Sequence, residues 1–382
     1  MSEPADYTLR DLTLYFLRLG TFGFGGPIAL VGYMQRDLVE TRCWVSAKDY
    51  KEGLALAQLA PGPLAAQLAI YLGWIRYGVV GATAVAIAFV LPSFLMVLGL
   101  SALYLRFGGL SWMHGAFYGI GAAVIAIIAR SAYKLSKSTL EKDRLLWVLF
   151  AVSALFTACT ESELVWLFVL SGVVTLVAKT RWTPSAPTAV MVAPWLVTGL
   201  HGEAASGTLW NIAWYFMEAG AFIFGSGLAI VPFLHGTVVG ELHWLSERQF
   251  LDAVAVAMIT PGPVVITVAF IGYLVAGPLG ATVAAIAVFF PCYLLVILPA
   301  RYFRRAVHDP RVKAFVDGVT AAAAGAIAGA AFVLGRRAVF DLPTVLICAV
   351  AFLALTKLKS ASEPVLILAA GVVGVLIAGN AP

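Results

Sequence analysis

The chain has 382 residues, of which 61% are hydrophobic and only 12% are charged, and its mean hydropathy is +0.93. A soluble domain carries about 25% charged residues, so this composition excludes a water-soluble protein and predicts several membrane spans. The net charge of +5 is spread along the chain, which favours basic cytoplasmic loops over a nucleic-acid partner.

In chain order, the sequence predicts two interrupted apolar segments followed by four continuous ones, and then the same series again. The interrupted segments cover 8–40, 46–76, 208–240 and 246–275, and the continuous runs cover 78–104, 112–133, 145–159, 162–178, 278–300, 314–335, 338–355 and 362–378. About 20 residues cross a bilayer as a helix. With the apolar stretch at 186–200, we expect thirteen crossings, or ten where interrupted segments are re-entrant.

The series repeats because the sequence itself is duplicated. YFLRLGTFGFGGPIA at 15–29 aligns with YFMEAGAFIFGSGLA at 215–229, at an offset of 200 residues. The same offset pairs Trp44 with Trp244, Ser46 with Ser246, Glu52 with Asp252, and Pro61-Gly62-Pro63 with Pro261-Gly262-Pro263. We therefore predict two homologous repeats, 1–181 and 206–382, joined by a linker at 182–205 that is able to cross the membrane.

The distribution of Lys and Arg indicates that the two repeats have opposite orientations. In the first repeat the basic loop follows the run at 112–133, whereas in the second it precedes the equivalent run at 314–335. Because basic loops stay on the cytoplasmic side, this shift by one span predicts an inversion. The expected fold class is an all-α polytopic membrane protein of two homologous inverted-topology repeats with broken or re-entrant helices.

Each repeat breaks its helices twice where the surroundings are most apolar. The breaks are FGFGGP (22–27) and APGP (60–63), then FIFGSG (222–227) and TPGP (260–263). Non-helical backbone survives in a membrane only where protein or water shelters it, and paired breaks in inverted repeats point to a transporter binding site. Helix N-termini after the PGP motifs suit an anion, so we expect the two PGP breaks to meet near the midplane. The alternative is that these breaks are kinks that only help the helices to pack and bind no ligand.

Charged residues inside apolar segments are functional candidates. Arg18 and Glu218 occupy equivalent positions just before the first break of each repeat. We expect Arg18 to contact a tetrahedral oxyanion with its planar guanidinium, and Glu218 to carry a proton or to pair with Arg18. Glu52 and Asp252 precede each PGP motif. We expect them on a solvated face, with proton coupling as the alternative.

The candidate sites follow from these breaks and their polar neighbours. The substrate-binding candidates are Arg18, Phe24, Gly25, Gly26, Pro27, Gln58, Pro61, Gly62, Pro63, Gln67, Phe224, Gly225, Gly227, Thr260, Pro261, Gly262 and Pro263, and the coupling candidates are Glu218, Glu52 and Asp252. Thr267 is a further neutral hydrogen-bonding group beside the second PGP motif.

Nothing in the sequence indicates an enzyme. The five histidines have no metal-ligand spacing, and there is no Walker A, GxSxG or Rossmann motif, so we expect no catalytic residue, no cofactor and no metal. The four cysteines are scattered and predict reduced thiols. The mixed-charge N-terminus predicts no cleaved signal peptide.

RLGTFGFGGP at 18–27, WVSAKDYKEGLALAQLAPGP at 44–63 and WLSERQFLDAVAVAMITPGP at 244–263 resemble the chromate ion transporter family. These are bacterial and archaeal inner-membrane proteins built from one or two such domains, and the resemblance covers essentially the whole chain in the two-domain form. It implies chromate efflux driven by membrane potential or proton exchange, with chromate resistance as the outcome and sulfate as the isosteric competitor.

The second repeat departs from the family pattern, because FGFGGP is replaced by FIFGSG and Arg18 is matched by Glu218. We therefore expect the first repeat to supply most of the anion contacts. A sulfate or other oxyanion importer on the same scaffold is an alternative, and a non-transporting membrane scaffold or sensor is a remote one. Glycine- and alanine-rich faces such as 321–331 fit packing within one chain or between two chains of a homodimer.

Overall fold

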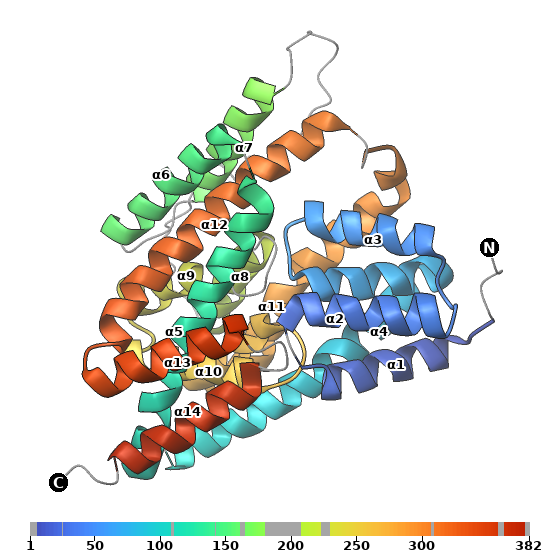
Figure 1. Ribbon diagram of the computed structural model, residues 1–382. Coiled ribbons are helices and arrows are strands. Elements are labelled where there is room, and N and C mark those ends of the chain that lie inside the picture. Colours follow the sequence, from blue (N-terminus) through green and yellow to red (C-terminus); the bar gives the residue numbers. More distant parts are fainter. Residues whose placement is uncertain are drawn as a thin grey trace.

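The computed structural model describes residues 6–24, 26–107, 111–141, 143–160, 165–179, 208–222, 230–306, 309–357 and 363–378. The helices are α1 (Leu9–Phe22), α2 (Gly26–Met34), η1 (Gln35–Thr41), α3 (Ala47–Leu59), α4 (Leu64–Phe107), α5 (Ser111–Leu140), α6 (Arg144–Thr160), α7 (Val165–Lys179), α8 (Thr208–Phe222), α9 (Ile230–His235), η4 (Gly236–Glu241), α10 (Glu247–Ile259), η5 (Val264–Ile266), α11 (Thr267–Ala306), α12 (Pro310–Ala338), α13 (Leu342–Lys357) and α14 (Glu363–Ala378) (Figure 1). No strand occurs in these ranges, which confirms the all-α prediction for the described part of the chain.

Four helices are long and apolar enough to cross a membrane. They are Leu64–Phe107, Gly115–Lys134, Val264–Ala300 and Pro310–Arg336, and four shorter apolar helices lie at 144–160, 167–179, 342–357 and 363–377. The chain is therefore a multi-pass membrane protein, as its composition predicts. The predicted linker at 182–205 lies outside the described residues.

The helices that lead into the two PGP motifs begin and end at the same signals in both repeats. Ser46 caps α3 and Ser246 caps α10, each by accepting a hydrogen bond from the backbone of the third helical residue. Ala60 and Thr260 end these helices with extended backbone, at ψ 140° and 141°, because a following proline disfavours the helical region. The duplicated serine and PGP motif thus delimit one 13-residue helix in each repeat.

The interrupted segments of the first repeat turn back on themselves. Trp44, beyond η1, stacks on Tyr7, just before α1, with ring centroids 5.1 Å apart. The Tyr77 hydroxyl, beyond the second break, donates a hydrogen bond to the carbonyl of the same Tyr7. Between them, a Cβ on Gly53 of α3 would lie 2.3 Å from the Tyr71 ring of α4. Each segment therefore forms two helices that enter the bundle and return to the face from which they started, which we name a re-entrant pair.

The long helices α4 and α11 each contain a sharp glycine turn. Gly78 has φ 58° and ψ −146°, and Gly277 has φ 64° and ψ −156°, a region that glycine adopts at little cost. After this turn α4 folds back, so that a Cβ on Gly73 would lie 2.5 Å from the Gly81 carbonyl oxygen. The short arms cover 64–77 and 267–275, and the long arms cover 79–107 and 278–306. The described residues hold the four long helices and the four shorter apolar ones, and the interrupted segments return to the face from which they enter. The predicted linker crossing lies outside these residues, so the number of crossings stays a prediction.

The equivalent helices α5 and α12 run antiparallel. A Cβ on Gly335, near the end of α12, would lie 3.5 Å from the side chain of Ile125 in the middle of α5. Leu140, at the end of α5, instead clusters with Ala321 in the first half of α12. Equivalent helices of opposite direction are what inverted repeats require, so the predicted inversion is confirmed.

This antiparallel arrangement gathers basic residues at one end of the bundle, which we name the basic face. It carries Lys134, Lys137, Lys179, Arg311 and Lys313. Helix α5 ends at the basic face, so it starts at the opposite face. Tyr104 near the end of α4 packs on Phe117 near the start of α5. The long arm of α4 therefore ends at the opposite face and begins at the basic face. The re-entrant pairs of the first repeat thus enter from the basic face, and those of the second repeat enter from the opposite face.

The last two helices of each repeat pack on the other repeat. Helices α6 and α7 lie along α12, and α13 and α14 lie along α5 (Figure 1). Glycine permits the close approach on both sides: a Cβ on Gly318 would lie 2.4 Å from the Ser171 carbonyl oxygen, and one on Gly119 would lie 2.0 Å from that of Ala370. Because these helices are exchanged, the two repeats form one interlocked bundle.

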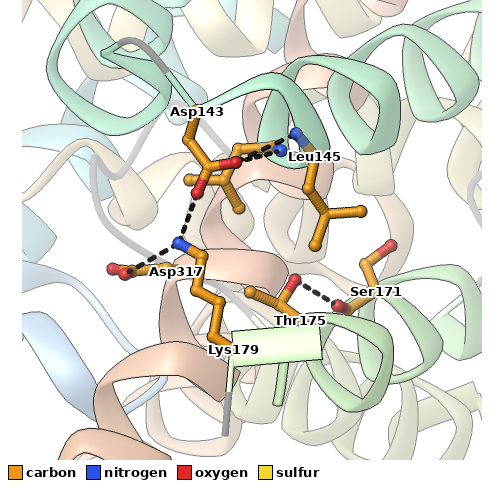
Figure 2. Close-up of polar contacts among 7 residues, drawn as sticks. Asp143, Leu145, Ser171, Thr175, Lys179 and Asp317 are labelled. Atoms are coloured by element: carbon orange, nitrogen blue, oxygen red, sulfur yellow. Dashed lines mark hydrogen bonds and ion pairs between the residues drawn. The ribbon is translucent and has the colours of Figure 1, made fainter. Parts of the chain in front are cut away.

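An ion-pair chain on the basic face joins the exchanged helices (Figure 2). The Lys179 Nζ atom at the end of α7 lies 2.6 Å from Asp143 Oδ2 and 3.9 Å from Asp317 Oδ2 of α12. Asp143 also accepts a hydrogen bond from the Leu145 backbone, 2.9 Å long, which caps α6. The hydrogen bond from Lys179 holds the pKa of Asp143 below its usual value.

We expect a Lys179→Met variant to lower the melting temperature of the purified protein. Because a partly exposed ion pair contributes up to about 1 kcal/mol, the expected decrease is a few degrees, and high salt should reduce it. The depressed pKa of Asp143 means that this contribution is present at neutral pH and is lost as acid protonates the carboxylate. Exposed Lys137 provides the control variant Lys137→Met; equal melting temperatures for the two variants contradict a role for the ion-pair chain.

Candidate functional site

The breaks of the two repeats meet inside the bundle. The backbone N–H of Gly262, in the second PGP turn, donates a hydrogen bond of 3.1 Å to the carbonyl of Gly23, in the first break of the first repeat. Ser93 of α4 donates a 2.7 Å hydrogen bond to the Pro261 carbonyl. The first repeat therefore holds the PGP turn of the second repeat at two points, both remote in sequence.

The first PGP turn has a different set of partners. The Gln67 side-chain amide folds back and donates a 2.6 Å hydrogen bond to the Pro61 carbonyl. On its other side, a Cβ on Gly62 would lie 3.0 Å from the sulfur of Cys292 in α11. Cys292 follows Pro291 as Ser93 follows Pro92, so each PGP turn lies against the equivalent residue of the opposite repeat. No hydrogen bond among the described residues joins the two PGP turns to each other, and their meeting near the midplane stays a prediction.

Both turns depend on glycine. Gly62 has φ 141° and Gly262 has φ 95°, values that residues with a Cβ rarely adopt. Space is also absent, because a Cβ on Gly262 would lie 2.0 Å from the Ser93 hydroxyl oxygen. The middle residue of each PGP motif is thus fixed by backbone geometry and by close packing.

A helix N-terminus follows the first turn, as predicted. The first intrahelical hydrogen bond of α4 runs from the Gln67 backbone N–H to the Pro63 carbonyl, so the preceding N–H groups have no intrahelical acceptor. In the second repeat the chain resumes as the 3₁₀ turn η5 before α11 begins at Thr267. The two N-termini are therefore not equivalent.

Gln67 is fully buried, and its carbonyl oxygen Oε1 has no hydrogen-bond partner. Gln58 is exposed instead. Thr260 and Thr267 are buried, but their hydroxyl groups donate to the carbonyls of Ala257 and Val264, each three residues earlier in the chain. Of these four predicted hydrogen-bonding residues, Gln67 is the one that combines burial with an unused acceptor.

Arg18 is exposed on α1 and has no hydrogen bond or ion pair with any described residue. It lies nine residues after Leu9, which at 1.5 Å per residue places it about 14 Å along the helix from the basic face. That is roughly half of a 30 Å hydrocarbon layer. Glu218 is exposed at the matching position of α8, and the structure does not pair it with Arg18, because the two re-entrant pairs enter from opposite faces.

The remaining residues of the first break follow α1 directly in the chain. Phe24 is 38% exposed, Gly26 begins α2, and Pro27 occupies the next position, where its missing N–H costs nothing. Gly25, Phe224, Gly225 and Gly227 lie outside the described residues.

The expectation of a solvated face for the two carboxylates is wrong for Asp252. Its side chain is only 3% exposed, and Tyr104 Oη donates a 2.8 Å hydrogen bond to Asp252 Oδ2. The equivalent Glu52 is half-buried. The hydrophilic neighbours of Asp252 in sequence suggested exposure, but the long arm of α4, which carries Tyr104, and helix α5 of the first repeat pack against α10.

Sequence analysis missed Ser93, Tyr104 and Cys292. Their positions in uninterrupted apolar runs gave no reason to select them. The available signal for Ser93 and Cys292 was their shared position directly after the matched prolines of GATAVAIAFVLP and GATVAAIAVFFP.

A separate cavity of about 470 Å³ lies between α4 and α11. Its walls are mainly apolar, including Ile87, Phe94 and Ile286, and its polar groups are Thr83, Thr282 and Tyr293. Thr83 and Tyr293 hydrogen-bond to each other. This composition does not suit an oxyanion, so the cavity is not the candidate site.

The structure therefore defines a multi-pass membrane protein of two inverted, interlocked repeats whose helix breaks meet in its interior. The family model of the chromate transporters matches residues 10–176 and 210–375. The chain is 57% identical to the chromate transport protein of Cupriavidus metallidurans (97% of this chain, 93% of the relative) and 55% identical to the probable chromate transport protein of Synechococcus elongatus (98% and 96%).

The chromate transport protein of Pseudomonas aeruginosa is 30% identical over 99% of this chain and 94% of its own length. No solved structure shows a significant match. The chain belongs to the chromate transporter family.

Proposed function

We propose that the chain is a secondary transporter that exports chromate across the inner membrane of a prokaryote and thereby confers chromate resistance. The observation that carries the proposal is Arg18, an exposed guanidinium without a hydrogen bond or ion pair to any described residue, about 14 Å along α1 from the basic face and just before the first break. An unpaired charge at this depth is costly, and a tetrahedral oxyanion that enters beside it would offset that cost with charge-assisted hydrogen bonds.

The distribution of charges supports export as the direction of transport. We infer that the basic face is cytoplasmic, since Lys and Arg accumulate there, so Arg18 would be reached from the cytoplasm through the re-entrant pairs of the first repeat. The potential of a cell that is negative inside contributes about 2.3 kcal/mol per charge per 100 mV. It favours the exit of each negative charge that the oxyanion carries by this amount, so export needs no ATPase.

The buried Oε1 atom of Gln67 supports chromate over sulfate. An unpaired acceptor in the interior requires a hydrogen-bond donor, and backbone N–H groups of α4 begin beside it. An oxyanion that carries one proton offers both oxygen acceptors and one O–H donor. Hydrogenchromate is populated near neutral pH, whereas sulfate remains fully deprotonated. Contacts to both the Gln67 Oε1 atom and the backbone N–H groups of α4 would therefore favour chromate.

Proteoliposomes containing the purified protein test this function. We expect labelled chromate to move at least tenfold faster than labelled sulfate at equal concentration, with flux accelerated by a potential that draws anions out through the opposite face. Net sulfate uptake that chromate does not block would replace the proposal with the oxyanion importer. The absence of flux for both anions would favour a non-transporting scaffold.

A further inference from the structure

A buried carboxyl group joins the two repeats near the face opposite the basic face. Asp252 belongs to α10 of the second repeat, whereas Tyr104, its hydrogen-bond donor, belongs to the long arm of α4 in the first repeat. The contact thus spans 148 residues of sequence. Anything that changes the charge of this carboxyl acts directly on the packing of one repeat against the other.

The surroundings of this carboxyl are largely apolar. The Tyr104 ring packs edge-on against Phe117 of α5 and Phe270 of α11, with centroids 5.6 and 5.2 Å away. The charged and titratable groups acting on Asp252 are Tyr104 and exposed Arg248, one helical turn closer to the surface. No ion pair of Asp252 occurs among the described residues. Burying a carboxylate without an ion-pair partner is expensive, so the neutral, protonated form is readily reached.

The position of Asp252 connects it to the candidate site. It lies on α10 nine residues before Pro261 and seven before the helix ends, roughly 10 Å along the helix axis, and α10 continues directly into the turn that contacts Gly23 and Ser93. The matched carboxyl, Glu52, lies on α3, which enters from the basic face. The two repeats therefore present one carboxyl group toward each side of the membrane.

Resting on the proposed oxyanion transport, we propose that Asp252, positioned by Tyr104, binds the proton that is exchanged for the oxyanion. The carboxylate takes up one proton when it is open to the face opposite the basic face and becomes neutral. It releases the same proton when the interlocked repeats move and expose it to the other side. Tyr104 is a positioning residue, because its hydroxyl group orients and stabilises the ionised carboxylate.

Everted membrane vesicles test the proposal, with a pH-sensitive dye reporting proton movement after a chromate pulse. We expect Asp252→Asn to reduce this proton signal at least tenfold while chromate flux driven by an imposed potential persists. Tyr104→Phe should keep the signal but move its pH profile to higher pH, since the ionised carboxylate loses a donor. The control is Glu241→Gln, an exposed carboxylate of the same repeat. A proton signal of wild-type size in Asp252→Asn overturns the proposal.

Carbodiimide labelling separates this proposal from the proposed function, because it reports a protonated buried carboxyl without transport. We expect mass spectrometry to find Asp252 modified, with labelling that falls as the pH rises. Chromate flux without any proton signal in the wild type overturns the role of Asp252 and leaves export intact. No chromate flux with pH-dependent labelling overturns the proposed function instead, and an unlabelled Asp252 at acidic pH contradicts the protonation itself.

Discussion

An Arg18→Ala variant is expected to lose about 30- to 100-fold in chromate transport while still inserting and folding. The side chain is exposed and has no hydrogen bond or ion pair with any described residue, so its removal breaks no such interaction there. A hydrogen-bonded pair with a charged group contributes about 2–3 kcal/mol, which converts to this loss at 1.4 kcal/mol per factor of ten. Initial rates in proteoliposomes, with melting temperature measured in parallel, check both halves of the expectation.

The conservative and control variants sharpen this test. Arg18→Lys keeps the charge but not the planar fork, so we expect transport between that of the wild type and Arg18→Ala. Arg10→Ala removes an exposed arginine near the start of the same helix and should transport normally. Wild-type rates for Arg18→Ala would remove this residue from the oxyanion path, and a matching loss in Arg10→Ala would indicate a general effect of surface charge.

The duplication and its inversion could be predicted because both leave local marks in the sequence. Paired motifs reveal the repeats, and the shift of the basic loop by one span reveals the opposite direction, which the antiparallel packing of α5 and α12 bears out. The helix breaks were also predictable, since glycine and proline restrict the backbone wherever they occur.

Whether a segment between these motifs crosses the membrane or returns to its own face could not be predicted. A segment that returns to its own face and one that crosses have the same apolar composition. The difference depends on contacts such as Tyr7 with Trp44, between residues 37 positions apart in the sequence. The packing of α6 and α7 on α12 likewise could not be predicted. All of these helices are apolar on several sides, so the pattern of apolar residues in each helix does not indicate which helix it packs against.

The same limit applies to the candidate site. Asp252 follows Glu247 and Arg248 in a short amphipathic stretch, and hydropathy alone favours solvent for all three. Its burial results from the long arm of α4, which brings Tyr104 across from the other repeat. Ser93 became a candidate in the same way, through a hydrogen bond to Pro261 that spans 168 residues.

A Gly262→Ala variant is expected to reduce chromate transport at least tenfold and to lower the melting temperature. The added Cβ would lie 2.0 Å from the Ser93 hydroxyl oxygen, so Ser93 must rotate away and lose its hydrogen bond to Pro261. The φ of 95° adds backbone strain of roughly 1–3 kcal/mol. Because this turn also donates to Gly23, its displacement moves the point at which the two repeats meet.

A double-mutant cycle with Ser93→Ala separates the two causes. Removal of the hydroxyl group relieves the collision but not the backbone strain, so the losses of Gly262→Ala and Ser93→Ala should add to more than the loss of the double variant. Gly99→Ala is the matched control, because a Cβ at this helical glycine of α4 meets nothing within 4 Å. Strictly additive losses would show that Ser93 does not hold the turn, whereas a comparable loss in Gly99→Ala would show that α4 tolerates no added methyl group at all. Partial recovery of transport in the double variant would assign Ser93, on the first repeat, the positioning of a helix break that belongs to the second.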